Sequence, residues 1–284
     1  MHAAPSLRRK LYFVSPLLTA LLFGVYERLG LRSLKARLLG LGRRTARPTT
    51  ADFARQSAEQ IRLLGLDKLE ILSGPFKGMR YGDFSYNSAL IPKLLGTYEA
   101  DLHGWVGEAL GAGYDAVINI GCAEGYYAVG LARMMPSATI HAYDIDERAR
   151  RACAELAAKN DVSDRVIIGG ELKPDGFEAF AGRRVLVMVD AEGAEVDILQ
   201  PALSPALAGM NIIVETHDLF RKGALAVLIQ RFAATHDITR VDQQPKAVVF
   251  PPWLQSLPHL DQLLAVWEWR AQPTPWLVMR PKSA

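Results

Sequence analysis

"VINIGCAEGYYAVGLA", residues 117–132, decides the fold. It begins with an apolar run typical of a buried strand, turns between two glycines, and continues with the spacing of a helix that Gly125 opens. A side chain at Gly121 or Gly125 would keep the backbone from approaching a ligand closely. The following helix would turn its free N–H groups and positive dipole end toward that turn. The stretch therefore predicts the first strand, the ligand loop and the first helix of an α/β fold.

The pattern of apolar strand and helix repeats after this stretch. Further strands are expected at 138–144, 165–170, 184–190 and 210–216, with helices between them. A closing pair is expected at 236–243 and 275–281, separated by a long excursion that contains Pro and Trp. Short Val/Ile/Leu runs between helices are typical of a parallel sheet covered on both faces. We therefore predict an α/β fold with a doubly wound, mostly parallel, Rossmann-like sheet.

The chain is predicted to divide into a basic N-terminal helical extension (1–50), a lead-in of helix and hairpin that covers the site (51–112), and the main domain (113–284). Within the lead-in, the expected elements are a helix from 50 to about 64, a β-hairpin over 69–82, and helices near 88–95 and 98–111. The hairpin is predicted from alternating residues around a Gly-Pro and Gly-rich turn.

Charge is distributed unevenly along the chain. Residues 1–50 contain ten Lys or Arg and one acid, a net charge of +9, whereas the other 234 residues contain 23 basic and 29 acidic groups, a net charge of −6. The acidic body argues against a nucleic-acid-binding core, and the basic extension has a separate role. Cys122 and Cys153 cannot form a disulfide framework and no zinc-binding pattern occurs, which favours a cytoplasmic protein. No sequence feature indicates an oligomeric state.

The extension contains an apolar stretch, 11–26, followed by leucines interleaved with basic residues. The apolar stretch is shorter than the roughly 20 residues of a membrane-spanning helix and contains Pro16. Two interpretations remain open besides spanning. The segment is a helix on the protein's own surface, or residues 8–44 form a basic amphipathic helix that touches an anionic membrane surface.

The loop restricts which ligand it binds. A dinucleotide loop has the form G-x-G-x-x-G, but here the second and third glycine positions hold Ala123 and Tyr126. The Gly-Lys-Ser/Thr of a phosphate-binding P-loop is absent. A ligand without phosphates, such as S-adenosylmethionine, makes weaker demands on the loop. Asp144, at the end of the next strand, is placed to accept hydrogen bonds from a ribose diol, although a helix-capping role is the alternative.

Two motifs, in the correct order, resemble those of the FkbM-like class I methyltransferases. "VLVMVDAEGAEVDIL" (185–199) is similar to the family's D-x-E-G-x-E signature, and "NIGCAEGYY" (119–127) is similar to its first loop. Asn119 and Cys122 depart from the family, which usually has an acid and a small residue there. The resemblance implies S-adenosylmethionine as the cofactor. The residues expected to bind it are Glu99, Asn119, Gly121, Cys122, Ala123, Glu124, Gly125, Tyr126, Asp144, Ile145, Glu171 and Asp190.

The ends of the fourth and fifth strands supply candidate catalytic residues. Asp190 is expected near the transferable methyl group, and His217 is expected to be the general base because histidine can be neutral near pH 7. A different interpretation is that the oxygen-rich set around His217 binds a divalent cation. Its members are Asp190, Glu192, Glu215 and His217.

The sequence thus predicts an S-adenosylmethionine-dependent methyltransferase, acting on the hydroxyl of a sugar or natural product. A small-molecule or glycan acceptor follows from the resemblance alone. Two alternatives are a non-catalytic nucleoside-binding or interaction module on the same fold, which Asn119 favours, and an NAD(P)-dependent oxidoreductase, which the loop register disfavours.

Overall fold

The computed structural model describes residues 69–282 of the 284, apart from 87, 246–248 and 271. By its internal contacts the chain divides into two units, Met1–Arg55 and Gln56–Ala284, and all described residues belong to the second. The predicted basic extension, its 8–44 membrane-contact segment and the helix expected from residue 50 lie outside the described residues. Within the described part of the chain, no helix has both the length and the apolar character needed to cross a membrane.

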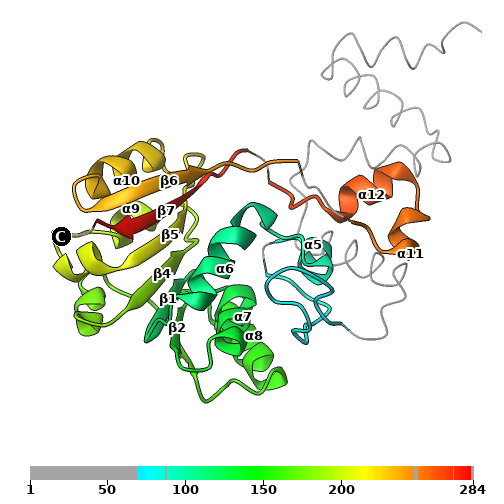
Figure 1. Ribbon diagram of the computed structural model, residues 1–284, viewed down its shortest axis with the longest axis horizontal. Helices are drawn as coiled ribbons and strands as arrows, with labels where there is room; N and C mark the ends of the chain where they lie inside the picture. Colours follow the sequence, from blue (N-terminus) through cyan, green and yellow to red (C-terminus); the bar gives the residue numbers. More distant parts are fainter. Residues whose placement is uncertain (1–68, 87, 246–248, 271, 283–284) are drawn as a thin grey trace, which may run out of the picture. The chain divides into compact units, whose positions relative to one another are not determined.

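A single sheet of seven strands organises the described residues (Figure 1). Its strands are β1 (Ala116–Ile120), β2 (Thr139–Tyr143), β3 (Val166–Gly169), β4 (Val185–Val189), β5 (Asn211–Glu215), β6 (His236–Val241) and β7 (Trp276–Pro281). The order is β3-β2-β1-β4-β5-β7-β6. Strands β1 to β5 are parallel, and β7 runs antiparallel to both β5 and β6. The predicted doubly wound, mostly parallel sheet with a closing strand pair is confirmed.

The apolar runs are continuous because both faces of the sheet are covered. Along β4, Leu186 and Met188 belong to one core cluster, whereas Val185, Val187 and Val189 belong to the other. The first cluster lies under α6 (His103–Gly111), α7 (Tyr126–Met134) and α8 (Glu147–Lys159), and the second under α9 (Glu195–Ile198) and α10 (Ala224–Phe232). The central strands β1, β4 and β5 therefore contribute alternate side chains to two separate cores.

The helices beside β4 are short. The sequence pattern predicts helices on both sides of this strand. The helix after it is α9, whereas the segment before it has the 3₁₀ helix η3 (Gly176–Phe180), and a second 3₁₀ helix, η4 (Pro205–Gly209), follows α9. Glycine and proline at the ends of these segments leave too few residues for a stable α-helix. The excursion before β7 contains two short helices, α11 (Pro252–Gln255) and α12 (His259–Ala265).

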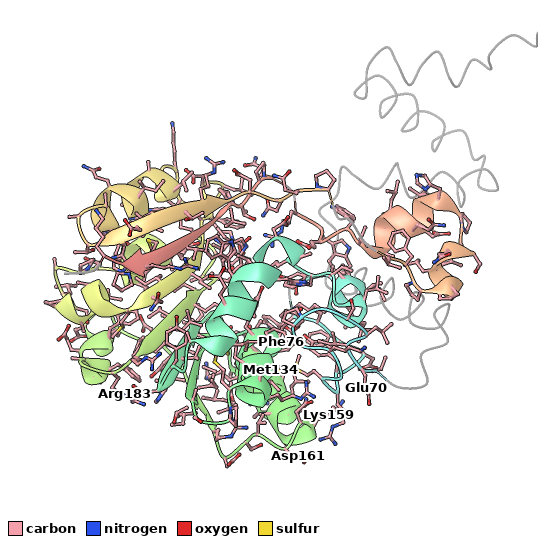
Figure 2. All side chains as sticks on the ribbon, viewed as in Figure 1. Glu70, Phe76, Met134, Lys159, Asp161 and Arg183 are labelled. Carbon is pink, nitrogen blue, oxygen red and sulfur yellow. The ribbon has the colours of Figure 1, made fainter. Side chains whose placement is uncertain are left out.

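The lead-in joins the same core as α7 and α8. Its helices are α5 (Leu90–Leu95) and the 3₁₀ turn η2 (Ala100–Leu102) before α6. The predicted hairpin is reduced to one antiparallel bridge between Glu70 and Arg80, because its turn folds inward instead of extending as two strands. Phe76, at that turn, is fully buried against Gly130 of α7, where an added Cβ would lie 2.6 Å from the ring. Figure 2 labels Phe76 and Met134, the last residue of α7.

The residues that follow this turn are bound to the C-terminal end of α8. The backbone of Arg80 exchanges two hydrogen bonds with the side chain of Asn160, at 2.9 and 2.7 Å. The Nζ atom of Lys159 donates to the carbonyl of Tyr81 at 2.9 Å, and Figure 2 shows Lys159 at the end of α8. These bonds hold the lead-in against the helices that follow β1 and β2.

Candidate active site

Strand register brings the predicted loop and the predicted ribose-binding acid together. Ile120, the last residue of β1, is paired with Tyr143 of β2 and Val189 of β4, so residues 121, 144 and 190 follow the strands at one sheet edge. Gly121 has φ +73°, and a Cβ there would lie 1.7 Å from the carbonyl oxygen of Asp190. Only glycine fits where these two backbone segments cross, and for this reason the loop begins with a glycine.

Asp144 holds the loop directly. Its Oδ2 atom accepts a hydrogen bond of 3.0 Å from the backbone N–H of Ala123, and its Oδ1 atom accepts one of 2.9 Å from Asp146. The side chain that caps α8 is Asp146, which accepts from the N–H of Arg148. Each oxygen of Asp144 keeps a second lone pair for a ligand hydroxyl. Next to it, Ile145 is 83% exposed, so an apolar surface lies open beside this carboxylate.

Three of the predicted cofactor residues direct their side chains into the core. Cys122, Glu124 and Tyr126 are each 4% exposed. The Tyr126 ring makes edge contacts with the rings of Phe76 and Tyr98, at centroid distances of 5.2 and 5.3 Å. The backbone of these three residues lies along the loop, while their side chains pack in the core beneath it.

Glu124 is the centre of a buried group that we call the clamp: Glu124, Lys93, Tyr81, Ser85 and Tyr86. The Glu124 carboxylate lies 2.5 Å from Nζ of Lys93 and accepts from the Tyr81 hydroxyl at 2.5 Å. It also accepts from the Ser85 hydroxyl and the Tyr86 N–H, both at 3.0 Å. Burial alone would raise the pKa of Glu124, but the Lys93 ammonium and these donors hold it below its ordinary value. The clamp fastens the loop to the lead-in.

A second group, the carboxylate cluster, lies where β4 and β5 end. Its members are Glu99, Asp190, Glu192, Glu195, Glu215 and Glu268, together with the cations His217 and Arg270. Of its carboxyl side chains, all but Asp190 and Glu192 are 5% exposed or less. The structure thus gathers the predicted Glu99, Asp190, Glu192, Glu215 and His217 in one place.

Arg270 neutralises one side of the cluster. Its guanidinium lies 2.7 Å from Glu99 and 3.0 Å from Glu268, and it also contacts Glu215. Burial nevertheless raises the pKa of Glu99 to about 7 and that of Glu215 to about 8, with neighbouring carboxylates adding to the shift and Arg270 opposing it. Burial likewise raises the pKa of Asp190 to about 6. One arginine does not balance the negative charge gathered here.

His217 occupies the other side of the cluster. Its Nδ1 atom donates to the Glu195 carboxylate, and its Nε2 atom lies 3.5 Å from Asp190 Oδ1, 3.6 Å from Glu215 Oε2 and 3.8 Å from Glu192 Oε2. Burial alone would lower the pKa of His217, but Glu195 and the other carboxylates raise it to about 9. The expectation that His217 is neutral near pH 7 is therefore wrong for this arrangement, because its acidic neighbours stabilise the imidazolium.

Two predicted residues stand apart from these groups. Glu171 is exposed and forms a surface pair with Lys173 at 2.6 Å. Asn119 is buried within β1, where its amide nitrogen makes a long 3.5 Å contact with the carbonyl of Met188. Its Oδ1 atom has no hydrogen-bond partner among the described residues.

Sequence reasoning missed Glu195, Glu268 and Arg270 of the carboxylate cluster, and Lys93, Tyr81, Ser85 and Tyr86 of the clamp. Glu195 had a signal, since it is the last acid of "DAEGAE", at 190–195. Lys93 lies in an apolar helix and Arg270 in the irregular excursion, and neither has a motif around it.

Comparison with known proteins gives a likeness of fold. No protein-family model and no curated protein matches the chain. An O-methyltransferase from Bacillus cereus in complex with SAH is 10% identical, over 88% of this chain and 97% of that one, with a TM-score of 0.44. The O-methyltransferase TomG from Streptomyces achromogenes, in complex with SAM, is 13% identical, over 84% and 93%, with a TM-score of 0.44.

A SAM-dependent O-methyltransferase from Thermotoga maritima is 12% identical, over 64% of each chain, with a TM-score of 0.41. At such identities and TM-scores, the function has to be inferred from the residues of the site.

Proposed function

We propose that this protein is an S-adenosylmethionine-dependent methyltransferase that methylates a hydroxyl group. The observation that carries the proposal is the hydrogen bond between the Ala123 N–H and the Asp144 carboxylate, beside the chain crossing of Gly121 with Asp190. A ribose-binding acid, an amino-acid-binding loop and a reactive acid are then neighbours at the carboxyl ends of β1, β2 and β4, where α/β sheets bind ligands. The D-x-E-G-x-E motif, similar to that of FkbM-like enzymes, supports the same proposal.

The residues fit this cofactor in three parts. The exposed Ile145 offers an apolar face to the adenine ring, and Glu171 follows the end of β3, the strand beside β2. Asp144 accepts from the ribose hydroxyls with its remaining lone pairs. The loop from Gly121 receives the amino-acid end, and the unpartnered Oδ1 of Asn119 is suited to accept from its ammonium group.

S-adenosylmethionine supplies a methyl group that its sulfonium already activates, so the protein's task is to align the acceptor and receive a proton. Transfer of this methyl group to an acceptor hydroxyl would break its bond to the sulfonium, leave SAH, and release the proton of the hydroxyl. We assign the proton to Asp190, whose pKa of about 6 makes it a carboxylate at neutral pH while keeping it basic enough to accept. His217, with its raised pKa, then stabilises negative charge instead of serving as the base.

The acceptor is a small molecule with a ring, such as a sugar or an aromatic natural product. Phe220 is 61% exposed in the loop after β5, and its ring centroid lies 6.0 Å from that of His217. An open aromatic face beside the reactive groups suits a sugar or flat ring. A lipid-linked glycan would combine this site with membrane contact by residues 8–44.

Binding is tested by thermal shift with SAH, S-adenosylmethionine and NAD, using Asp144→Asn and its neighbour Asp146→Asn. Asp144→Asn removes one acceptor oxygen and the charge, so SAH affinity should fall by about 10-fold or more. Asp146→Asn, at the cap of α8, should leave SAH affinity within about twofold. If SAH fails to stabilise the wild-type protein, or if NAD stabilises it instead, the proposal is wrong. Methyl transfer to candidate acceptors is measured by mass spectrometry. SAH binding without any such transfer would favour the non-catalytic module.

A further inference from the structure

The imidazole ring of His217 is held in one orientation by a hydrogen bond from its Nδ1 atom. Its side chain is 5% exposed, and Nδ1 contacts a carboxylate oxygen of Glu195, which is fully buried in α9. A carboxylate can only accept, so Nδ1 is the nitrogen that carries the hydrogen. This orientation turns Nε2 toward the remaining carboxylates. A carboxylate on the far nitrogen of a histidine is the arrangement that typically fixes a metal-binding imidazole.

Nε2 of His217 has carboxylate neighbours but no hydrogen bond among the described residues. The three oxygens that surround it lie at 3.5 to 3.8 Å and come from Asp190, Glu192 and Glu215. The nearest, Asp190 Oδ1, is itself buried and has no hydrogen-bond partner among the described residues, although the Asp190 side chain as a whole is 32% exposed. The imidazole nitrogen and a buried carboxylate oxygen thus face each other without being bonded, which is costly for the oxygen unless something lies between them.

The spacing of these atoms suits a cation. One ligand atom each from Asp190, Glu192 and His217 lie within 4.8 Å of one another. Ligands bound at about 2.0–2.3 Å to a common ion are roughly 3 to 4.5 Å apart, depending on the angle between them. Glu215 Oε2 lies 3.6 Å from Nε2 but does not belong to this group of three.

Charge favours the same conclusion. Arg270 is occupied by Glu99, Glu215 and Glu268. Asp190, Glu192 and Glu195 are left with His217 as the cationic side chain near them. Even a protonated His217 leaves this half of the carboxylate cluster negative, and a divalent cation would balance it.

We propose that Asp190, Glu192 and Nε2 of His217 bind a divalent transition-metal cation, with Glu195 orienting the imidazole. An imidazole nitrogen among carboxylates favours Mn²⁺ or Zn²⁺ over Mg²⁺ or Ca²⁺. Binding follows from the geometry alone, whereas its role rests on the proposed function. There, the cation would take the place of the proton on Nε2 of His217 as the positive charge of the site, hold the acceptor hydroxyl beside Asp190 and ease the loss of its proton.

The test is a titration of the full chain, stripped with chelator, with Mn²⁺ alone, followed by electron paramagnetic resonance and calorimetry. The wild-type protein should bind one Mn²⁺ saturably and show magnetic coupling to an imidazole nitrogen. Asp190→Asn and His217→Gln should each weaken binding by about 10-fold or more, and His217→Gln should also remove the nitrogen coupling. Glu195→Gln should weaken binding by about 10- to 100-fold while the coupling persists at saturation.

Asp197→Asn is the matched control. Asp197 lies on the same helix as Glu195, but its carboxylate is exposed and paired with Arg221 at 2.8 Å, so Mn²⁺ affinity should not change. Thermal melts confirm that each variant is folded. Absence of saturable Mn²⁺ binding at millimolar concentration, or full nitrogen coupling in His217→Gln, would overturn the site. SAH binding is measured on the same samples. If SAH binds and Mn²⁺ does not, the cation site alone fails, and the reverse result removes only the methyltransferase proposal.

Discussion

The clamp and the carboxylate cluster both contain buried acids beside basic side chains, but they differ in how completely those acids are paired. In the clamp, a single carboxylate, Glu124, meets a single ammonium and three further donors, and all its partners are in place. In the carboxylate cluster, six acids share two cations. There, Asp190 Oδ1 and Glu195 Oε2 have no hydrogen-bond partner among the described residues.

The difference indicates what each region does. A buried charge whose partners are complete contributes order to the fold and gives a ligand nothing to bind. Buried charges whose partners are incomplete cost stability, and proteins retain them where chemistry needs them. The pKa values agree, since that of Glu124 is lowered whereas those of Glu99, Asp190 and Glu215 are raised. We therefore interpret the clamp as structural and propose the carboxylate cluster as the functional region.

Breaking the clamp should produce the largest effect. Glu124→Gln leaves the Lys93 ammonium buried without a counter-charge, so the free energy of unfolding should fall by about 3–5 kcal/mol in urea denaturation. Glu147→Gln, in an exposed pair with Arg151, should change it by less than about 1 kcal/mol. If the two substitutions cost the same, the clamp is no more than a surface ion pair. The double variant Lys93→Met/Glu124→Gln should recover part of the loss.

Replacing an acid by its amide in the carboxylate cluster should change the free energy of unfolding in the opposite direction. Asp190→Asn removes one of several like charges that burial already disfavours. Without added metal, it should leave the free energy of unfolding unchanged or raise it by about 1 kcal/mol. Methyl transfer should fall by about 100-fold or more, because the proposed proton acceptor is gone. A loss of several kcal/mol in Asp190→Asn would remove the contrast between the two regions.

The fold and the position of the site could be predicted because they depend on local patterns. Apolar runs of five residues between helices define parallel strands, and parallel strands that share a register end at one edge. Residues 121, 144 and 190 each follow such a strand directly, so their meeting follows from the strands alone. The structure confirms the sheet and brings the loop to Asp144.

Side-chain direction and ionisation could not be predicted, because they depend on residues far away in the sequence. Glu124 was expected to face a ligand, but it turns inward to Lys93, 31 residues earlier. His217 was expected to be neutral, but Glu195, 22 residues earlier, helps to keep it charged. Arg270 reaches Glu99 across 171 residues from a segment without any motif. Such contacts exist only once the chain has folded.

The smallest expected effect is a pH dependence that separates the two regions. The pKa of Glu124 is lowered in the folded protein from its ordinary value of 4.5, so folding favours its ionised form. Its contribution should be complete above about pH 5 to 6 and should diminish as the pH falls through 4.5 toward the folded value. The stability difference between the wild-type protein and Glu124→Gln, from urea denaturation at each pH, should thus be constant near neutrality and narrow in acid.

The difference between the wild-type protein and Asp190→Asn should not follow this course, since the pKa of Asp190 is raised, and charging it costs stability as the pH rises through about 6. Parallel pH courses for the two differences would mean that both carboxylates occupy equivalent surroundings, and the distinction between clamp and cluster would have no energetic basis.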